Sequence, residues 1–452
     1  MISLKAVRLI NTWSWNIYVP WLYLFYLRGF YILSGIKALL SPYRGMPKEI
    51  YVIFVSRIVN AMGCFVMPLM TIIMTDRIGL SKEATGFYLS LNSLVFPLAS
   101  MVGGKLADSF GRKSLIIIFD TMAALLYLYC GFMEPSMSLI YLILAASACM
   151  SVAGPAHDSL IADLTTPENR EGAYALSYLG WNIGFAVGPM LGGFLYRKYL
   201  PLIFIGDAAT ALLSISLIFF FVKETIGKTT EDISDASRRL ERREEGSIVS
   251  VLFRRPILIY FAIIAFGYHF AYSQWNFLMP IHSMQNFGSL GAQYFGWMAS
   301  LNGLVVILFT PILTKVTEKM KGMRKMVYGI LLYAIGFGML GVLNSLSYFF
   351  LSVFIFTLGE ILLSISVMPF IVNHTPASHR GRMSAIIPTI MGMGYAIGPM
   401  MMGKILNYSS IESAWLMVGG LTAITAVFMF GLEKYENRTN IKVEEAEEAL
   451  EA

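Results

Sequence analysis

Charged residues are scarce in this chain. Asp, Glu, Lys and Arg make up 14% of its 452 residues, and 56% of the residues are hydrophobic. A soluble domain carries about a quarter of its residues as charges, so this balance excludes an ordinary soluble fold. The apolar residues also gather in runs of about 20, the length that crosses the hydrocarbon core of a bilayer as a helix. The sequence therefore predicts an all-α membrane protein.

Cysteine and the motifs of catalytic chemistry are also scarce. The three cysteines, Cys64, Cys130 and Cys149, lie in apolar runs without disulfide or metal-ligand spacing, so we interpret them as small buried hydrophobes. The sequence contains no metal-ligand cluster, no glycine-rich phosphate loop before a lysine and no nucleophile motif. We therefore expect no enzyme activity, no cofactor, no metal and no use of ATP. A cleavable signal peptide is not apparent either.

Apolar windows predict transmembrane helices along most of the chain. A long charged stretch divides these windows into two sets of six. The expected spans lie near 50–75, 84–107, 113–133, 137–163, 171–195, 200–222, 256–283, 292–314, 325–344, 347–371, 383–407 and 411–433.

Basic residues are distributed unevenly between the two sides that these spans define. Cytoplasmic loops carry an excess of Lys and Arg. With the N-terminus placed in the cytoplasm, nearly all of the 34 basic residues fall on the inner side. Those expected outside are Arg77, Lys82, Arg197, Lys198 and Lys404. This bias predicts that both termini are cytoplasmic, and it explains the net charge of +6 without a nucleic-acid partner.

The windows divide the chain into five parts. Residues 1–48 are rich in Trp and Tyr and are expected to lie in the membrane interface; an additional span there is the alternative. Two six-helix bundles are expected at 49–222 and 256–433. A cytoplasmic linker at 223–255 joins them, and a cytoplasmic tail follows at 434–452.

The two sets of spans carry an internal repeat. The segment Gly184–Pro189 in the fifth span matches Gly394–Pro399 in the eleventh, and both read Gly-x-x-x-Gly-Pro. Shared hydrophobicity alone does not produce such identities. The repeat therefore predicts two pseudo-symmetric bundles, and the rocking of such bundles about a central site is the usual physical basis of alternating access.

A motif rich in glycine and charge, GKLADSFGRK, joins the second and third spans. It resembles the signature loop of the major facilitator superfamily, a family of twelve-span transporters. The resemblance implies a cytoplasmic gate in which glycines allow a tight turn and close helix approach while charges pair, and which favours the outward-facing state. The alternative is a topogenic loop with solvated charges. The gate residues are Gly104, Asp108, Gly111, Arg112 and Asp163.

The fifth span carries a second motif, made of Gly184, Gly188, Pro189, Gly192 and Gly193. It resembles the motif of the proton-coupled drug antiporters in the same family. Physically it is a smooth face that packs closely, with a bend at the proline. Generic small-residue packing is the alternative, because the eleventh span has a near copy.

The sequence departs from the antiporter pattern in the fourth span. Those antiporters commonly carry an arginine there, whereas 145–154 contains none and Arg57 in the first span is the nearest substitute. The proton-relay residues of the antiporters are therefore not carried over to this chain.

Ionisable side chains at membrane depth are costly and need a reason. The family resemblance implies that spans 1, 4, 7 and 10 line a central cavity. Glu360, near the middle of span 10, is the main candidate proton carrier because desolvation favours its neutral form. His269 and Gln274 of span 7 are further cavity candidates. A permanently protonated Glu360 and a neutral, packing His269 are the alternatives.

A second polar group is expected nearer the cytoplasm. Arg57 of span 1 is predicted to form an ion pair with Asp158 of span 4, and Asn60 extends the polar strip by one turn. Snorkelling of Arg57 alone is the alternative. His157 points away from Asp158 on a helix, so we expect it to face a neighbouring helix. Two further acids are interpreted as structural, Asp120 and Asp207.

Together these features favour a proton-coupled transporter of small molecules that acts as a monomer in the plasma membrane. The preferred function is efflux of amphipathic or drug-like compounds in exchange for protons, since few fixed charges suit a tolerant cavity. The alternative is an uptake symporter for a polar or anionic metabolite, with Arg57 holding the anionic group. Pairing of Arg57 with Asp158 would count against this alternative.

Overall fold

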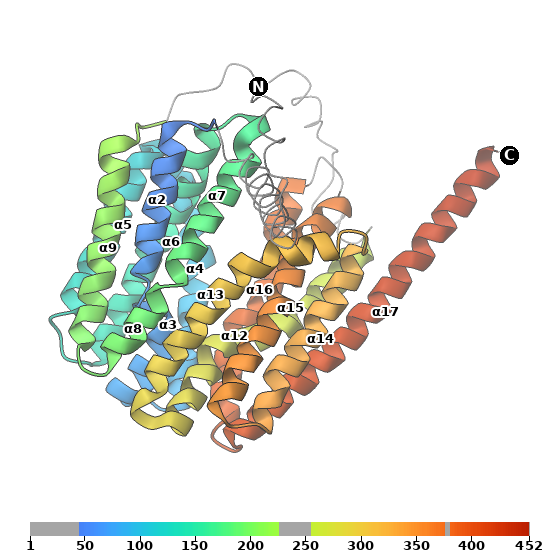
Figure 1. The fold of residues 1–452 in the computed structure, drawn as a ribbon. Helices are drawn as coiled ribbons and strands as arrows, with labels where there is room; N and C mark the ends of the chain where they lie inside the picture. Colours follow the sequence, from blue (N-terminus) through green and yellow to red (C-terminus); the bar gives the residue numbers. More distant parts are fainter. Residues whose placement is uncertain (1–44, 226–254, 376–379, 452) are drawn as a thin grey trace, which may run out of the picture.

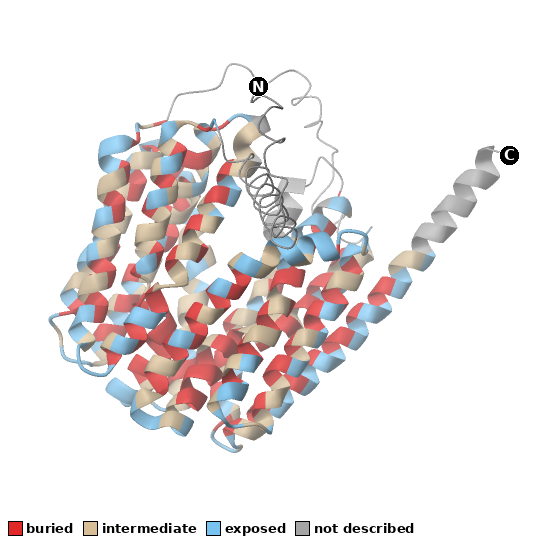
Figure 2. Cartoon of the chain, viewed as in Figure 1, coloured by how far each residue is buried: buried red, intermediate tan, exposed pale blue. Residues whose placement is uncertain are grey.

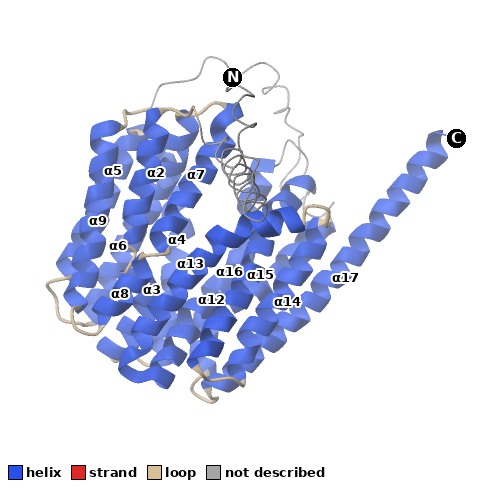
Figure 3. Cartoon of the chain, in the orientation of Figure 1, coloured by secondary structure: helices blue, strands red, loops and turns tan. Residues whose placement is uncertain are grey.

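The computed structural model describes residues 45–225, 255–375 and 380–451. Helices form nearly all of the described chain, and no strand occurs within these ranges (Figure 3). The all-α prediction is therefore confirmed. The aromatic segment at 1–48 and the linker at 223–255 lie almost entirely outside the described residues.

The chain forms two helical halves. The N-terminal half contains α2 (Lys48–Met62), α3 (Val66–Ile72), the π-helix η2 (Ile73–Arg77), α4 (Lys82–Phe110), α5 (Arg112–Cys130), α6 (Met137–Asp163), α7 (Pro167–Phe185), α8 (Gly188–Tyr196) and α9 (Leu200–Phe221). The C-terminal half contains α12 (Pro256–Phe287), η3 (Gly288–Leu290), α13 (Gly291–Val316), α14 (Gly322–Gly338), η4 (Met339–Gly341), α15 (Leu346–Asn373), α16 (Arg380–Ile405) and α17 (Ile411–Glu451).

Among the described residues, nine helices or continuous helical stretches are long and apolar enough to cross a membrane. One of them, Pro256–Val316, covers two of the expected spans. The expected spans at 171–195 and 383–407 are not among the nine, and the first of them is interrupted between Phe185 and Gly188. The chain is thus a multi-pass membrane protein, and the number twelve stays a prediction.

Large apolar side chains cover the outside of the helices as well as the inside. Phe132, Phe220 and Val316 are 76%, 74% and 73% exposed, whereas Phe204 and Phe261 are at most 2% exposed. Figure 2 shows the buried residues in red between the helices and exposed ones on their outer faces. In water such an apolar exterior would be unfavourable, so these faces are suited to lipid.

The first expected span is broken. Helix α2 ends at Met62 and α3 begins at Val66, and a carboxyl oxygen of Asp207 on α9 accepts the Val66 N–H (3.2 Å). A Cβ added at Gly63 would overlap the Thr210 hydroxyl, which lies one turn from Asp207. Asp207, 7% exposed, therefore caps the start of the outer segment, which agrees with its structural interpretation.

Contacts between the halves gather at one end of the molecule, which we name the contact end. It comprises α3, η2, α8, the start of α4, the C-terminal part of α12, the start of α13 and the end of α16. The ribbons of the two halves meet there and diverge toward the opposite end (Figure 1). Hydrogen bonds join Ser90 to Met400 N–H (3.1 Å) and Glu83 to Asn407 (2.8 Å) across it.

The repeat predicted from the sequence has a counterpart in the packing. In the N-terminal half, α7 packs on α2 and α8 packs on α13 of the other half; in the C-terminal half, α16 packs on α12 and also on α4. Each of these repeated segments thus contacts one helix within its half and one across the contact end.

Candidate functional site

Glu360 lies on α15 within a set of polar side chains from several helices. The Nδ2 of Asn302 on α13 donates to its Oε2 (2.8 Å) and also to the Thr357 hydroxyl (2.9 Å). The Tyr272 hydroxyl on α12 is a second polar group that interacts with the Glu360 carboxyl. The carboxyl is therefore held by a neutral donor, and no cation of the described residues pairs with it.

Tyrosines surround this carboxyl. Tyr272 stacks on Tyr333 of α14 with ring centroids 5.7 Å apart, and contacts Tyr395 of α16 at 6.4 Å. Glu360 also interacts electrostatically with Tyr178 of α7, which belongs to the other half. The Tyr395 hydroxyl accepts a hydrogen bond from Asn276 Nδ2 (2.7 Å). The site is thus amphipathic, with aromatic faces around one ionisable group.

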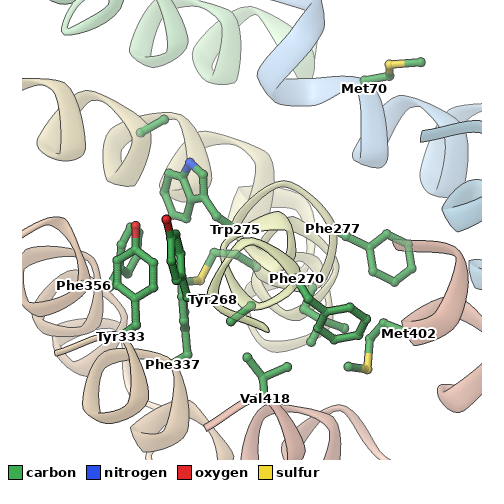
Figure 4. Close-up of a cluster of buried hydrophobic side chains, with 14 of the residues drawn as sticks. Met70, Tyr268, Phe270, Trp275, Phe277, Tyr333, Phe337, Phe356, Met402 and Val418 are labelled. Carbon is green, nitrogen blue, oxygen red and sulfur yellow. The ribbon is translucent and has the colours of Figure 1, made fainter. Parts of the chain in front are cut away.

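An aromatic cluster packs against the tyrosines of this site. Phe337 stacks on Phe356 (4.8 Å), which contacts Trp275 (5.1 Å), and Tyr333 contacts Phe337 (5.4 Å). Figure 4 shows these rings beside one another at the junction of α12, α14 and α15. Such interlocked rings resist displacement, so they fix the positions of the Tyr333 and Tyr272 rings.

His269 and Gln274 take different positions from Glu360. His269 stacks on Tyr268 at 4.6 Å and makes no hydrogen bond within the described part of the chain. Gln274 is 0% exposed, and its amide donates to the Phe270 carbonyl (3.1 Å) and the Ser273 hydroxyl (2.8 Å) of its own helix. Neither is bonded to Glu360 in this conformation, and their roles in the cavity stay predictions.

Arg57 does not form the ion pair predicted for it. Among the described carboxylates, none lies within 4.0 Å of its guanidinium, and its buried Nε has no hydrogen-bond partner. Asp158 and Asp120 act on its charge only from a greater distance. Asn60 lies one turn further along α2. The predicted Arg57–Asp158 pair is therefore wrong for this conformation.

Asp120 instead pairs with His157. Their side chains, from α5 and α6, approach to 2.8 Å between Nε2 and Oδ2. This confirms the expectation that His157 faces a neighbouring helix. The pairing was missed because Asp120 was placed from its sequence position alone, without a partner.

The gate motif forms a charged turn between α4 and α5. The Nε of Arg112 lies 3.2 Å from Asp163 Oδ2 of α6, and its Nη1 donates to the Ala107 carbonyl (2.8 Å). Gly111 has φ of +95°, which only glycine adopts readily. Asp163, expected as the acidic partner of this loop, thus contacts Arg112, whereas the expected pair of Asp108 on α4 with Arg112 falls on a side chain outside the described part.

Two residues of this region escaped the sequence analysis. Glu224, just after α9, accepts the N–H groups of Arg112 (2.9 Å) and Ser114 (3.0 Å) at the start of α5. A Cβ added at Gly103 would overlap the Val152 carbonyl on α6, whereas one at Gly104 has nothing within 4 Å. Close helix approach, expected at Gly104, therefore occurs at Gly103. An acid directly after a span was the available signal for Glu224.

The motif of the fifth span packs on two sides. A Cβ at Gly188 would lie 2.7 Å from the Ala61 carbonyl of α2, and one at Gly192 3.2 Å from Phe65; Gly184 meets α2 in the same way. A Cβ at Gly193 would lie 2.6 Å from the Ala292 carbonyl of α13, across the contact end. The helix is interrupted between Phe185 and Gly188, directly before Pro189, and the bend expected there stays a prediction.

A pocket of about 700 Å³ also opens at the contact end. It lies between η2 and α8 on one side and the end of α12 on the other, with Asp76, Arg77, Lys82 and Arg197 in its lining. Arg77 is bound to the Tyr196 carbonyl (2.9 Å), and Asp76 accepts the Tyr196 hydroxyl (2.8 Å). These bonds lie within one half, so they do not hold the halves together. Within the described residues, no group of His, Cys, Asp and Glu could hold a metal ion.

Comparisons with known proteins agree with this arrangement. The model of the Major Facilitator Superfamily matches residues 52–387 and 264–452. The multidrug resistance protein MdtH of Proteus mirabilis is 25% identical, over 90% of this chain and 98% of the relative. A Na(+), Li(+), K(+)/H(+) antiporter of Planococcus maritimus is 22% identical, over 84% of this chain and 94% of the relative.

Solved structures show the same fold. A POT family transporter in complex with a thioalcohol-conjugated peptide superposes with a TM-score of 0.73, at 14% identity, over 87% of this chain and 97% of the other. At that identity the likeness concerns the arrangement of helices alone.

Proposed function

Since the chain belongs to the Major Facilitator Superfamily, a family of transporters and not of enzymes, we propose that it exports amphipathic or drug-like compounds in exchange for protons. The curated relatives include a multidrug resistance protein and a cation/proton antiporter, which support exchange. The carrying observation is Glu360, an ionisable carboxyl held by Asn302 and Tyr272 among aromatic rings.

The proposed architecture has twelve spans in two six-helix bundles, with both termini in the cytoplasm. On this orientation the contact end faces outward, because it contains Arg77, Lys82, Arg197 and Lys404, the basic residues expected outside. The conformation is then closed to the outside although Arg112 and Asp163 are in contact, so this contact alone does not hold the outward-facing state expected of the gate. The bundles at 49–222 and 256–433, the linker and the tail are part of this proposal, as is the position in the plasma membrane as a monomer.

In the proposed cycle Glu360 carries the proton. It takes a proton from the outside, releases it to the cytoplasm, and substrate occupies the aromatic surroundings while the carboxyl is ionised. A proton carried inward across a membrane potential of 100 mV releases about 2.3 kcal/mol, which can drive the export of substrate. Alternating access follows from the two halves rocking about the site.

Transport in proteoliposomes tests this function. The purified protein is reconstituted, a pH gradient is imposed, and the movement of an amphipathic dye such as ethidium is followed. We expect dye to move against the direction of proton flow, and Glu360→Gln to abolish the response to the gradient. Glu318→Gln removes an exposed carboxyl by the same chemical change and should leave transport unaltered. Gradient-driven flux that persists in Glu360→Gln would remove Glu360 from the coupling role.

Uptake by symport is the second candidate, and one observation favours it. Arg57 has no ion pair among the described carboxylates, so its guanidinium is available to an anionic group. The same proteoliposomes distinguish the two functions. Movement of an anionic probe in the direction of proton flow, lost in Arg57→Gln but retained in Lys319→Gln, would support symport.

A further inference from the structure

Helix α12 contains a proline that leaves one carbonyl without its usual partner. Pro280 lies inside the helix and has no N–H, so the carbonyl of Asn276, four residues earlier, receives no hydrogen bond from it. The Thr71 hydroxyl of α3 donates to this carbonyl from the opposite half. Thr71 is 1% exposed, so its hydroxyl has no access to water as an alternative partner. A helix defect in one half is thus satisfied by a side chain of the other.

Asn276 also reaches toward Glu360. Its side-chain amide donates to the Tyr395 hydroxyl (2.7 Å), and the Tyr395 ring contacts the Tyr272 ring at 6.4 Å. The Tyr272 hydroxyl in turn interacts with the Glu360 carboxyl. Tyr272 and Asn276 are four residues apart on α12, so they lie on the same face one turn apart. A continuous set of contacts therefore runs from Glu360 to the contact end.

We propose that Thr71, Asn276 and Pro280 form a latch between the halves whose closure is coupled to the protonation of Glu360. This proposal rests on the proposed function, since it gives Glu360 the proton. Thr71 and Asn276 are positioning residues in it: they touch neither proton nor substrate, and act through Tyr395 and Tyr272.

The coupling follows from hydrogen-bond chemistry. An ionised Glu360 accepts from both Asn302 and Tyr272, whereas a protonated carboxyl turns one oxygen into a donor and weakens one of these bonds. Tyr272 then loses its fixed position, Tyr395 follows, and the Asn276 peptide is no longer held against Thr71. The ionised state therefore favours the closed latch. By linkage, closing the latch favours ionisation to the same extent.

Other titratable groups near Glu360 do not change their charge in the pH range of the test. The ionisable side chains that face it are Tyr272 of α12, Tyr333 of α14, Tyr395 of α16 and Tyr178 of α7. Asn302 of α13 does not titrate. Tyrosine ionises near pH 10, so all four stay neutral between about pH 5 and pH 8. A change of conformation in that range that depends on Glu360 therefore reports its own carboxyl.

The test measures the fraction of closed molecules at the two ends of this pH range. Spin labels are placed at exposed Lys198 and Ser289, on opposite sides of the contact end, in a variant whose three cysteines are replaced. Pulsed distance measurements in nanodiscs give the closed-to-open ratio at about pH 5 and about pH 8. The coupling factor is the closed-to-open ratio at about pH 8 divided by the ratio at about pH 5. We expect it to be above about 5 in the otherwise unaltered protein and near 1 in Glu360→Gln.

Thr71→Val removes the donor at almost constant volume and should lower the coupling factor by about 2- to 10-fold, the worth of one hydrogen bond. Pro280→Ala supplies an N–H to the Asn276 carbonyl within the helix and should act in the same direction. Tyr395→Phe removes the acceptor of Asn276 and should also lower the factor. Ser90→Ala is the matched control, because it removes another hydrogen bond across the contact end that has no link to Glu360.

The control separates the outcomes. Ser90→Ala should shift the closed-to-open ratio equally at both pH values and leave their quotient unchanged. If Thr71→Val does the same, Thr71 is merely one more contact between the halves and the latch is refuted. A coupling factor in Glu360→Gln equal to that of the unaltered protein would instead refute the proposed role of Glu360, whatever Thr71 does. If Thr71→Val does not fold, Pro280→Ala and Tyr395→Phe decide.

Discussion

Two neighbouring glycines of α4 meet different surroundings. Gly103 faces the Val152 backbone of α6, where a side chain would overlap a carbonyl oxygen, while Gly104 faces open space. Which of two adjacent residues meets the neighbouring helix depends on rotation of α4 about its axis. The sequence pattern leaves that rotation undetermined, so the motif directed the expectation to Gly104.

Substitutions at these glycines should therefore differ. We expect Gly103→Val to lower the thermal denaturation midpoint in detergent by several degrees, since overpacking against backbone costs about 1–3 kcal/mol or more. Gly104→Val should stay close to the unaltered protein. Equal destabilisation by both substitutions would contradict the packing described here.

The charged residues show the same limit of sequence reasoning. Asp163 was assigned to the gate because its position matches a motif with a fixed geometry, and it contacts Arg112. Arg57 and Asp158 were paired from their depth along two helices alone. Depth gives no information on rotation or on side-chain reach, and the guanidinium lies apart from Asp158.

At the scale of helices, a carboxylate just after α9 and one within α17 bind groups at the starts of other helices. Glu224 accepts main-chain N–H groups at the start of α5. Glu433 of α17, 2% exposed, binds Arg324 near the start of α14 at 2.7 Å. The loop between α13 and α14 corresponds by position to the loop between α4 and α5 and lacks the GKLADSFGRK pattern, yet the start of α14 also binds a carboxylate from the last helix of its half. A comparison of sequence motifs does not detect this similarity, because the two carboxylates lie far from the loops in the sequence.

Removal of the Glu224 carboxylate should destabilise the start of α5. We expect Glu224→Ala to cost about 1–2 kcal/mol, because the first N–H groups of a helix lose both a cap and a favourable charge. The measurement is thermal denaturation in detergent. Glu318→Ala, at an exposed site, serves as the control, and a comparable loss there would argue against a capping role.

Stability should also depend on pH through His374, which follows α15. Burial lowers its pKa, but Glu436 of α17 at 2.9 Å and the Phe370 carbonyl raise it more, so the pKa lies above its usual value. A raised pKa stabilises the folded protein when the ring is protonated. This contribution is complete below about pH 6.5 and is lost as pH rises through the folded-state pKa.

Glu436→Gln should therefore reduce the stability of the protein near pH 5.5 and leave it nearly unaltered near pH 8.5. The two denaturation midpoints, compared with those of the unaltered protein, check this expectation. A loss of equal size at both pH values would show that Glu436 contributes by packing and not by its charge.

At the scale of the whole molecule, the repeat was the most informative feature of the sequence. It predicted that 171–195 and 383–407 are equivalent, and these segments pack in equivalent ways. Neither segment is among the helical stretches that qualify as membrane spans within the described residues. Glycine at position 193 permits close contact between the halves, since a Cβ there would overlap the Ala292 carbonyl of α13.

Contact between the halves can be tested at Gly193. Because a Cβ there would meet the α13 backbone at 2.6 Å, we expect Gly193→Val to prevent closure of the contact end and to abolish transport with normal insertion in the membrane. Gly420→Val, at a glycine with nothing within 4 Å, is the control. Normal transport by Gly193→Val would show that this approach is not required in the cycle.

The break between Met62 and Val66 has a mechanical consequence. An unbroken helix is stiff, so a change of tilt at one end also moves the other end. Here the span is interrupted between α2 and α3. The interruption contains Gly63, and Asp207 binds the Val66 N–H at the start of α3. The position of α3, which carries Thr71, can therefore change relative to Asn276 while α2, which carries Arg57, stays in place.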